Sequence, residues 1–206
     1  MLEYQNMNRQ QLEYAVLLAF EILFLGFAVQ AVLIEDTTRF YVVLGSMALL
    51  TVPVLVEKKI SIALPFGTKS TIALALFLHS AGGINRWYWK FMPYYDKLAH
   101  GVSALALGLL IFSFFLVLDY WEIRVRPSRI LLWTFILVFL FGLCWEVGEY
   151  YIDVLVQSSY NNGVIDSILD IVSNIIGAII AIAIAAHYLK SVPGGETPGS
   201  LINPVR

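Results

Sequence analysis

Long apolar runs separated by short polar segments dominate the hydrophobic pattern of this 206-residue chain. A membrane-spanning helix needs about 20 mostly apolar residues. Five runs meet or approach that length, and a sixth, over residues 70–83, is shorter. The longer runs cover residues 12–34, 40–56, 98–118, 130–156 and 164–189. The pattern predicts an all-α polytopic membrane protein with about six transmembrane helices in one bundle.

The composition also indicates an integral membrane protein. Hydrophobic residues make up 59% of the sequence and charged residues 14%, whereas soluble domains average about 45–50% and about 25%. The net charge of −2 gives no reason to expect nucleic acid as a partner. We expect one transmembrane helical domain over residues 1–190 and a flexible cytoplasmic tail over residues 191–206, which is rich in proline and glycine.

The basic residues predict the orientation, because loops on the cytoplasmic side carry an excess of Lys and Arg. With six spans, nine Lys and Arg residues fall on the side of the termini and four on the other side. The sequence therefore predicts a multi-pass protein of the plasma membrane with both termini in the cytoplasm.

Ionisable and polar residues inside the predicted helices gather at the end opposite the termini. Charged groups within a bilayer are costly, so each requires a partner or a function. Asp96 and His100 are spaced i, i+4 and share a helix face, as do Asp166 and Asp170. The residues at this outer end are His79, Asp96, His100, Glu146, Glu149, Asp166, Asp170 and Asn174.

Carboxylates combined with histidines are typical of divalent-cation sites and of acid–base catalysis. Oxygen ligands suit Mg or Mn, and added imidazole suits Zn. Crowded carboxylates cannot all ionise, and one that stays protonated serves as a general acid or in a proton relay. The expected metal ligands are Asp96, His100, Asp170 and His79. The expected catalytic residues are Glu146, Glu149 and Asp166. No motif for an organic cofactor is present.

Structural roles for the same residues remain open from the sequence alone. Asp96 can cap the helix that it precedes, and Asp166 can stabilise a helix N-terminus through the helix dipole. Basic residues on the same side, Lys97 among them, can form ion pairs with Asp96. Asn174 suits an interhelical hydrogen bond, and Glu21, in the middle of the first run, has no evident role.

Three segments carry a resemblance to known families: YDKLAH at 95–100, WEVGE at 145–149 and DSILDIVSNIIGA at 166–178. They resemble the VanZ-like and YjdF-like families of small prokaryotic membrane proteins, which share an Asp-Lys-x-x-His, an acidic pair on the next helix and an acidic run on the last. The resemblance covers roughly residues 94–181, and an Arg that often precedes the last run in VanZ-like proteins is absent. It implies an active or binding site in the membrane without supplying a reaction.

These observations favour a membrane enzyme, a divalent-metal-assisted hydrolase or transferase acting on a lipid or lipid-linked substrate from the outer half of the bilayer. Membrane lipid is then the expected partner, and Mg, Mn or Zn the expected metal. Two alternatives stay open. One is a proton- or cation-coupled transporter or ion pathway, and the other is a non-catalytic accessory protein with an ion-paired acidic cluster.

Overall fold

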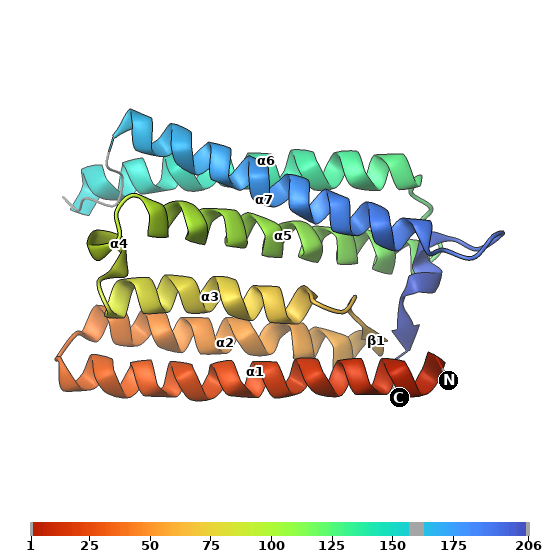
Figure 1. Ribbon diagram of the computed structural model, residues 1–206, viewed down its shortest axis with the longest axis horizontal. Coiled ribbons are helices and arrows are strands. Elements are labelled where there is room, and N and C mark those ends of the chain that lie inside the picture. Colours follow the sequence, from red (N-terminus) through yellow and green to blue (C-terminus); the bar gives the residue numbers. More distant parts are fainter. Residues whose placement is uncertain (1, 157–162, 205–206) are drawn as a thin grey trace. The chain divides into compact units, whose positions relative to one another are not determined.

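The computed structural model describes residues 2–156 and 163–204, and this part of the chain is almost entirely helical (Figure 1). The long helices are α1 (Leu2–Leu33), α2 (Thr37–Ile60), α3 (Thr68–Ile84), α5 (Tyr94–Tyr120), α6 (Pro127–Val156) and α7 (Val164–Lys190). The short elements are β1 (Ile62–Ala63), α4 (Trp87–Lys90), the 3-10 helix η1 (Pro198–Leu201) and β2 (Asn203–Pro204).

The six apolar runs correspond to the six long helices, which are longer than their runs by between one residue in α7 and nine residues in α1. Five of them, α1, α2, α5, α6 and α7, are long and apolar enough to cross a membrane. Helix α3 has 17 residues and extends about 26 Å at 1.5 Å per residue, slightly less than a hydrocarbon core of about 30 Å. The prediction of an all-α polytopic membrane protein is confirmed.

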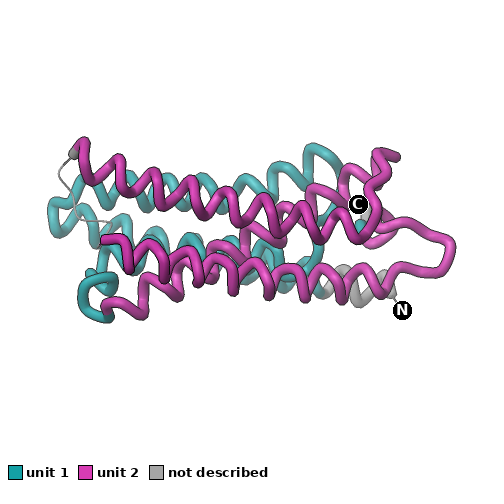
Figure 2. The backbone as a smooth tube through the Cα atoms, turned by 90° about the horizontal axis from the view of Figure 1, so that it is seen from above, with its two compact units in different colours: residues 1–91, 202–206 teal, residues 92–201 magenta. Residues whose placement is uncertain are grey.

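The chain forms two compact units (Figure 2). Unit 1 comprises Met1–Phe91 with Ile202–Arg206, and unit 2 comprises Met92–Leu201. Within unit 1, β1 and β2 pair antiparallel, with Ile62 opposite Pro204. The single domain over residues 1–190 stays a prediction.

Helices α1, α2 and α3 of unit 1 pack around a small apolar core. Phe24, Val43, Leu50 and Ala73 are almost completely buried there. Helix α2 begins after Asp36, whose side chain accepts a hydrogen bond from the Arg39 amide at 2.9 Å and so satisfies one of the unpaired N–H groups of the first turn. The outward-facing side chains of these helices are largely Leu, Val and Ile, as a lipid-facing surface requires.

A buried ion network joins α1, α2 and α3 in unit 1. The Lys69 ammonium lies 3.0 Å from Glu13 Oε2 and 2.5 Å from Glu57 Oε1. The Leu64 N–H also donates a hydrogen bond to Glu57 Oε1. The two remaining oxygens, Glu13 Oε1 and Glu57 Oε2, accept hydrogen bonds from the Gly67 N–H and the Tyr14 hydroxyl. These three charged residues are at most 1% exposed. The network therefore fixes the chain between α2 and α3 against α1.

Small residues let α5 and α7 of unit 2 approach closely. A Cβ added to Gly177 would overlap the carbonyl oxygen of Gly101 and lie 2.9 Å from the Ala104 Cβ. A Cβ added to Gly108 would lie 2.5 Å from that of Ala181. Close backbone approach through small residues is the common way to pack helices in membranes. Figure 1 shows α5, α6 and α7 running side by side.

The segment after α7 lies against the end of α5 in unit 2. The Gly199 N–H donates a hydrogen bond to Asp119 Oδ2 at 2.7 Å, and the Arg124 guanidinium lies 3.2 Å from the same oxygen. Pro198 and Gly199 are buried. The segment predicted to be a flexible tail thus contains residues with defined contacts to α5.

Candidate functional site

The first turns of α5 carry Asp96, Lys97 and His100 of the candidate site. Helix α5 begins at Tyr94, one residue after Pro93, so Asp96 is its third residue. The interpretation of Asp96 as the helix cap is therefore wrong, since the helix extends further toward its N-terminus than the apolar run. Asp96 and His100 share a helix face, as their i, i+4 spacing predicts.

Lys97 joins three aspartates from two helices. Its ammonium nitrogen lies 3.0 Å from Asp96 Oδ2, 2.5 Å from Asp166 Oδ1 and 2.6 Å from Asp170 Oδ1. The Asp170 side chain is 3% exposed and that of Lys97 16%. The close packing of α5 on α7 brings these groups within reach, so the small-residue contact and the polar site form together. The predicted pairing of Lys97 with Asp96 is confirmed.

The buried imidazole of His100 lies between two groups of carboxylates. Its Nε2 atom is 3.6 Å from Asp96 Oδ1 and 3.7 Å from Asp170 Oδ1. Its Nδ1 atom is 3.7 Å from Glu146 Oε1. Asp96, His100 and Asp170 offer ligand atoms within 4.8 Å of one another, and so do His100, Glu146 and Glu149. Nitrogen and oxygen donors in this number fit a divalent ion such as Mn or Zn.

The two glutamates of α6 differ in their surroundings. Glu149 Oε1 accepts a hydrogen bond from the indole of Trp145 at 2.8 Å. Glu146 is 6% exposed, and across residues 2–156 and 163–204 no donor meets hydrogen-bond geometry to either of its oxygens. The Ser167 hydroxyl lies close to the Glu146 carboxylate. Glu146 is therefore a buried carboxylate whose neighbours are the His100 ring and the Ser167 hydroxyl, and no lysine or arginine of residues 2–156 and 163–204 lies within ion-pair distance of it.

The site residues expected from sequence fall into two groups. Unit 2 brings together Asp96, His100, Glu146, Glu149, Asp166 and Asp170. His79 belongs to unit 1, where its Nδ1 atom is hydrogen-bonded to the Tyr88 hydroxyl at 2.7 Å. Asn174 is buried, and its amide nitrogen lies 2.9 Å from where a Cβ on Gly142 would be, so α6 passes closely over it. In the described part of the chain, Glu21 Oε1 is buried without a hydrogen-bond partner.

Lys97 has more contacts in the structure than the sequence predicted. It was predicted to form an ion pair with Asp96, but the structure makes it the centre of three carboxylates. The sequence offered one indication of this role, because Lys97 is the only lysine or arginine in the motif at residues 95–100. The Glu13–Lys69–Glu57 network was missed altogether, since its members lie at the ends of the apolar runs, where charged residues are ordinary.

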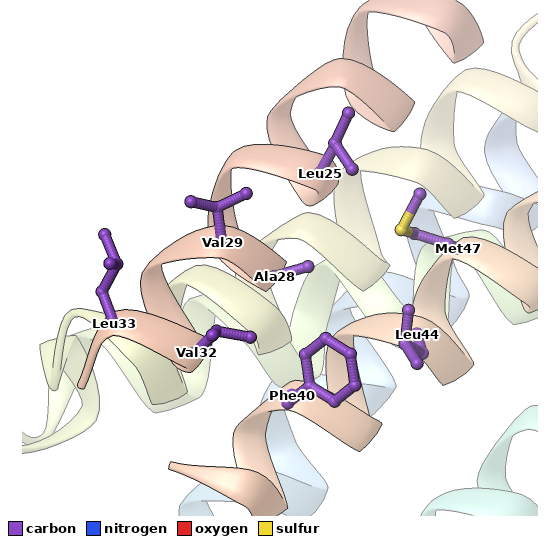
Figure 3. Close-up of a pocket in the computed structure, with 8 residues that line it drawn as sticks. All are labelled: Leu25, Ala28, Val29, Val32, Leu33, Phe40, Leu44 and Met47. Carbon is purple, nitrogen blue, oxygen red and sulfur yellow. The ribbon is translucent and has the colours of Figure 1, made fainter. Parts of the chain in front are cut away.

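An apolar groove lies between α1 and α2 in unit 1, and its lining differs from the polar cluster of unit 2. Its volume is about 370 Å³, and no polar side chain lines it (Figure 3). Figure 3 shows its lining residues, which are Leu25, Ala28, Val29, Val32, Leu33, Phe40, Leu44 and Met47. Such a groove can hold hydrocarbon but has no group for chemistry. The candidate site is therefore the polar cluster of unit 2.

Comparison with known proteins identifies a family. The family described as "Predicted membrane protein (DUF2238)" matches residues 14–191. The chain is also similar to a protein of Thermotoga maritima described as an uncharacterized protein, with 24% identity over 157 residues, 72% of this chain and 75% of that protein. No solved structure matches the chain.

Proposed function

This chain belongs to the family of predicted membrane proteins DUF2238, and we propose that it is a divalent-metal-assisted hydrolase or transferase acting on a lipid or lipid-linked substrate. The position of His100 carries the proposal, because this buried imidazole contributes to both groups of closely spaced ligand atoms. A site built within membrane-spanning helices meets its substrate in the bilayer. The resemblance of the motifs to VanZ-like and YjdF-like proteins is part of this proposal.

Each type of side chain has a role in such a reaction. A bound Mg, Mn or Zn ion supplies Lewis acidity and a water of lowered pKa. His100 would hold the ion together with carboxylates among Asp96, Asp170, Glu146 and Glu149. A carboxylate left outside the ligand set, such as Asp166, accepts or donates the proton that the reaction moves. Lys97 keeps the aspartates in place through its three ion pairs.

The proposed setting is the outer half of the plasma membrane with both termini in the cytoplasm. The excess of basic residues on the side of the termini supports this orientation. Lipid head groups of the outer leaflet then lie at the level of the site.

The test compares wild-type protein with His100→Ala and, as a matched control, His187→Ala. His187 lies 17 residues beyond Asp170 on α7, or about 26 Å along the helix. We expect bound metal and release of phosphate or fatty acid from mixed-lipid bicelles in wild type and His187→Ala, and neither in His100→Ala. Absence of metal in all three after exposure to Mn, Zn and Mg would contradict the proposal and favour a proton or cation pathway, which flux into proteoliposomes would then measure.

A further inference from the structure

We propose that the divalent ion binds on the Nδ1 side of His100, to Glu146 and Glu149, and that Lys97 keeps Asp96 and Asp170 out of the ligand set. This inference rests on the proposed function and narrows its ligand set. It reverses two expectations from sequence, which placed the aspartates as ligands and the glutamates as acid–base groups.

The two ring nitrogens of His100 face different carboxylates. Nδ1 faces Glu146, whereas Nε2 faces Asp96 and Asp170. A neutral imidazole has a lone pair on one nitrogen and a proton on the other. It therefore coordinates one ion through one nitrogen and donates a hydrogen bond through the other, so only one of the two carboxylate groups shares the ion with it.

The Nε2 side is already occupied by a cation. Lys97 contacts Asp170 Oδ1 at 2.6 Å, and this is the same oxygen that faces His100 Nε2. A divalent ion on that side would have to displace the ammonium group, or bind beside it against charge repulsion, which is strong where water is scarce. Lys97 thus gives Asp96 and Asp170 their counter-charge.

The Nδ1 side has no such ammonium group in residues 2–156 and 163–204. Glu146 is 6% exposed, and its neighbours are the His100 ring at 3.7 Å and the Ser167 hydroxyl. A buried carboxylate without a full counter-charge is costly. Its ligand atom lies within 4.8 Å of those of His100 and Glu149. A divalent ion between these three groups would supply the charge that Glu146 lacks.

The aspartates then act on the histidine. Histidines that bind metals almost always donate their other ring N–H to a carboxylate, which fixes the tautomer and the ring orientation. Asp96 and Asp170 stand at 3.6 and 3.7 Å from Nε2, and moving about 0.5 Å closer would complete a hydrogen bond. Lys97 holds both aspartates and is in this sense a positioning residue.

The experiment measures Mn²⁺ binding to the full chain in detergent by electron paramagnetic resonance. Wild-type protein should bind one Mn²⁺, and Glu146→Gln should lose it. Asp170→Asn should keep it with about 10–100-fold weaker affinity, as for the loss of a group that orients a ligand. Asp166→Asn is the matched control, since it removes the same charge beside Lys97 from a residue that belongs to neither group of closely spaced ligand atoms. Its affinity should stay within about tenfold of wild type.

Substitution of Lys97 tests the second half of the inference. Lys97→Met should raise the stoichiometry from one Mn²⁺ to two, because Asp96 and Asp170 become available, and Lys97→Arg should keep it at one. If Lys97→Met does not fold, the double variant with Asp166→Asn, which removes one of the repelling carboxylates, carries the same test. A stoichiometry that stays at one in the folded variant would overturn the role of Lys97.

The outcomes separate this inference from the proposed function. If wild type binds Mn²⁺, Asp170→Asn loses it and Glu146→Gln retains it, the ligand assignment is wrong while the metal enzyme stands. If wild type binds no Mn²⁺, both fall together.

Discussion

Lys69→Met should destabilise unit 1 strongly, because it breaks a buried ion network. Lys69, Glu13 and Glu57 are all at most 1% exposed, and the substitution leaves two buried carboxylates without the ammonium that both contact. Breaking a buried ion pair by removing one partner costs about 3–5 kcal/mol. Donors remain for both carboxylates, including the Gly67 N–H and the Tyr14 hydroxyl. We therefore expect a loss near the lower end, about 3 kcal/mol in the free energy of unfolding.

Unfolding in mixed micelles by SDS, followed by circular dichroism, measures this loss. The double variant Lys69→Met, Glu57→Gln should lose about 1–3 kcal/mol less in the free energy of unfolding than the sum of the two single variants, because Glu57→Gln removes one of the carboxylates left without the ammonium. Lys58→Met is the matched control at an exposed position of α2, and it should change stability by no more than about 0.5 kcal/mol. A loss below about 1 kcal/mol for Lys69→Met, or strict additivity in the double variant, would refute the reasoning.

Two further predictions concern unit 2. Gly177→Ala should cost about 1–3 kcal/mol through overpacking, because its Cβ would overlap the backbone of α5, whereas Gly148→Ala, with open space around it, should be neutral in the same unfolding assay. Asp119→Ala should speed hydrogen exchange at the Gly199 amide, because it removes the carboxylate that accepts the hydrogen bond of this amide. Arg124→Ala should speed this exchange much less, since the Arg124 side chain is 56% exposed and its ion pair with Asp119 contributes little.

The helices could be predicted from the sequence because lipid imposes a simple rule on them. Each spanning segment must satisfy its backbone internally and present apolar side chains, and this leaves a run that is visible without any tertiary information. The residues at which the helices begin and end could be predicted less well, since polar residues such as Asp36 belong to the caps and first turns and not to the apolar run. Helix α5 illustrates this, because it starts four residues before the run begins.

Six of the residues predicted for the site lie close together in unit 2, but their individual contacts could not be predicted from the sequence. The i, i+4 spacings fix which residues of one helix share a face, and alternating helix directions fix which ends meet. Which atoms touch depends on the rotation and separation of neighbouring helices. Those follow from contacts such as that of Gly177 with Gly101, and no periodicity in the sequence gives them. The contacts of Lys97 with Asp166 and Asp170 across two helices could therefore not be predicted, although its contact with the neighbouring Asp96 could.

Two buried charged clusters within the described ranges differ in how completely their charges are paired. In unit 1, Lys69 has a carboxylate on two sides, and all four oxygens of Glu13 and Glu57 have a donor. Nothing further is needed there for stability. In unit 2, five carboxylates surround one ammonium and one imidazole, and Glu146 has no ammonium or guanidinium group within ion-pair distance among the residues described. Buried charge left in this state is costly, and this cost supports the proposal that a cation binds in unit 2.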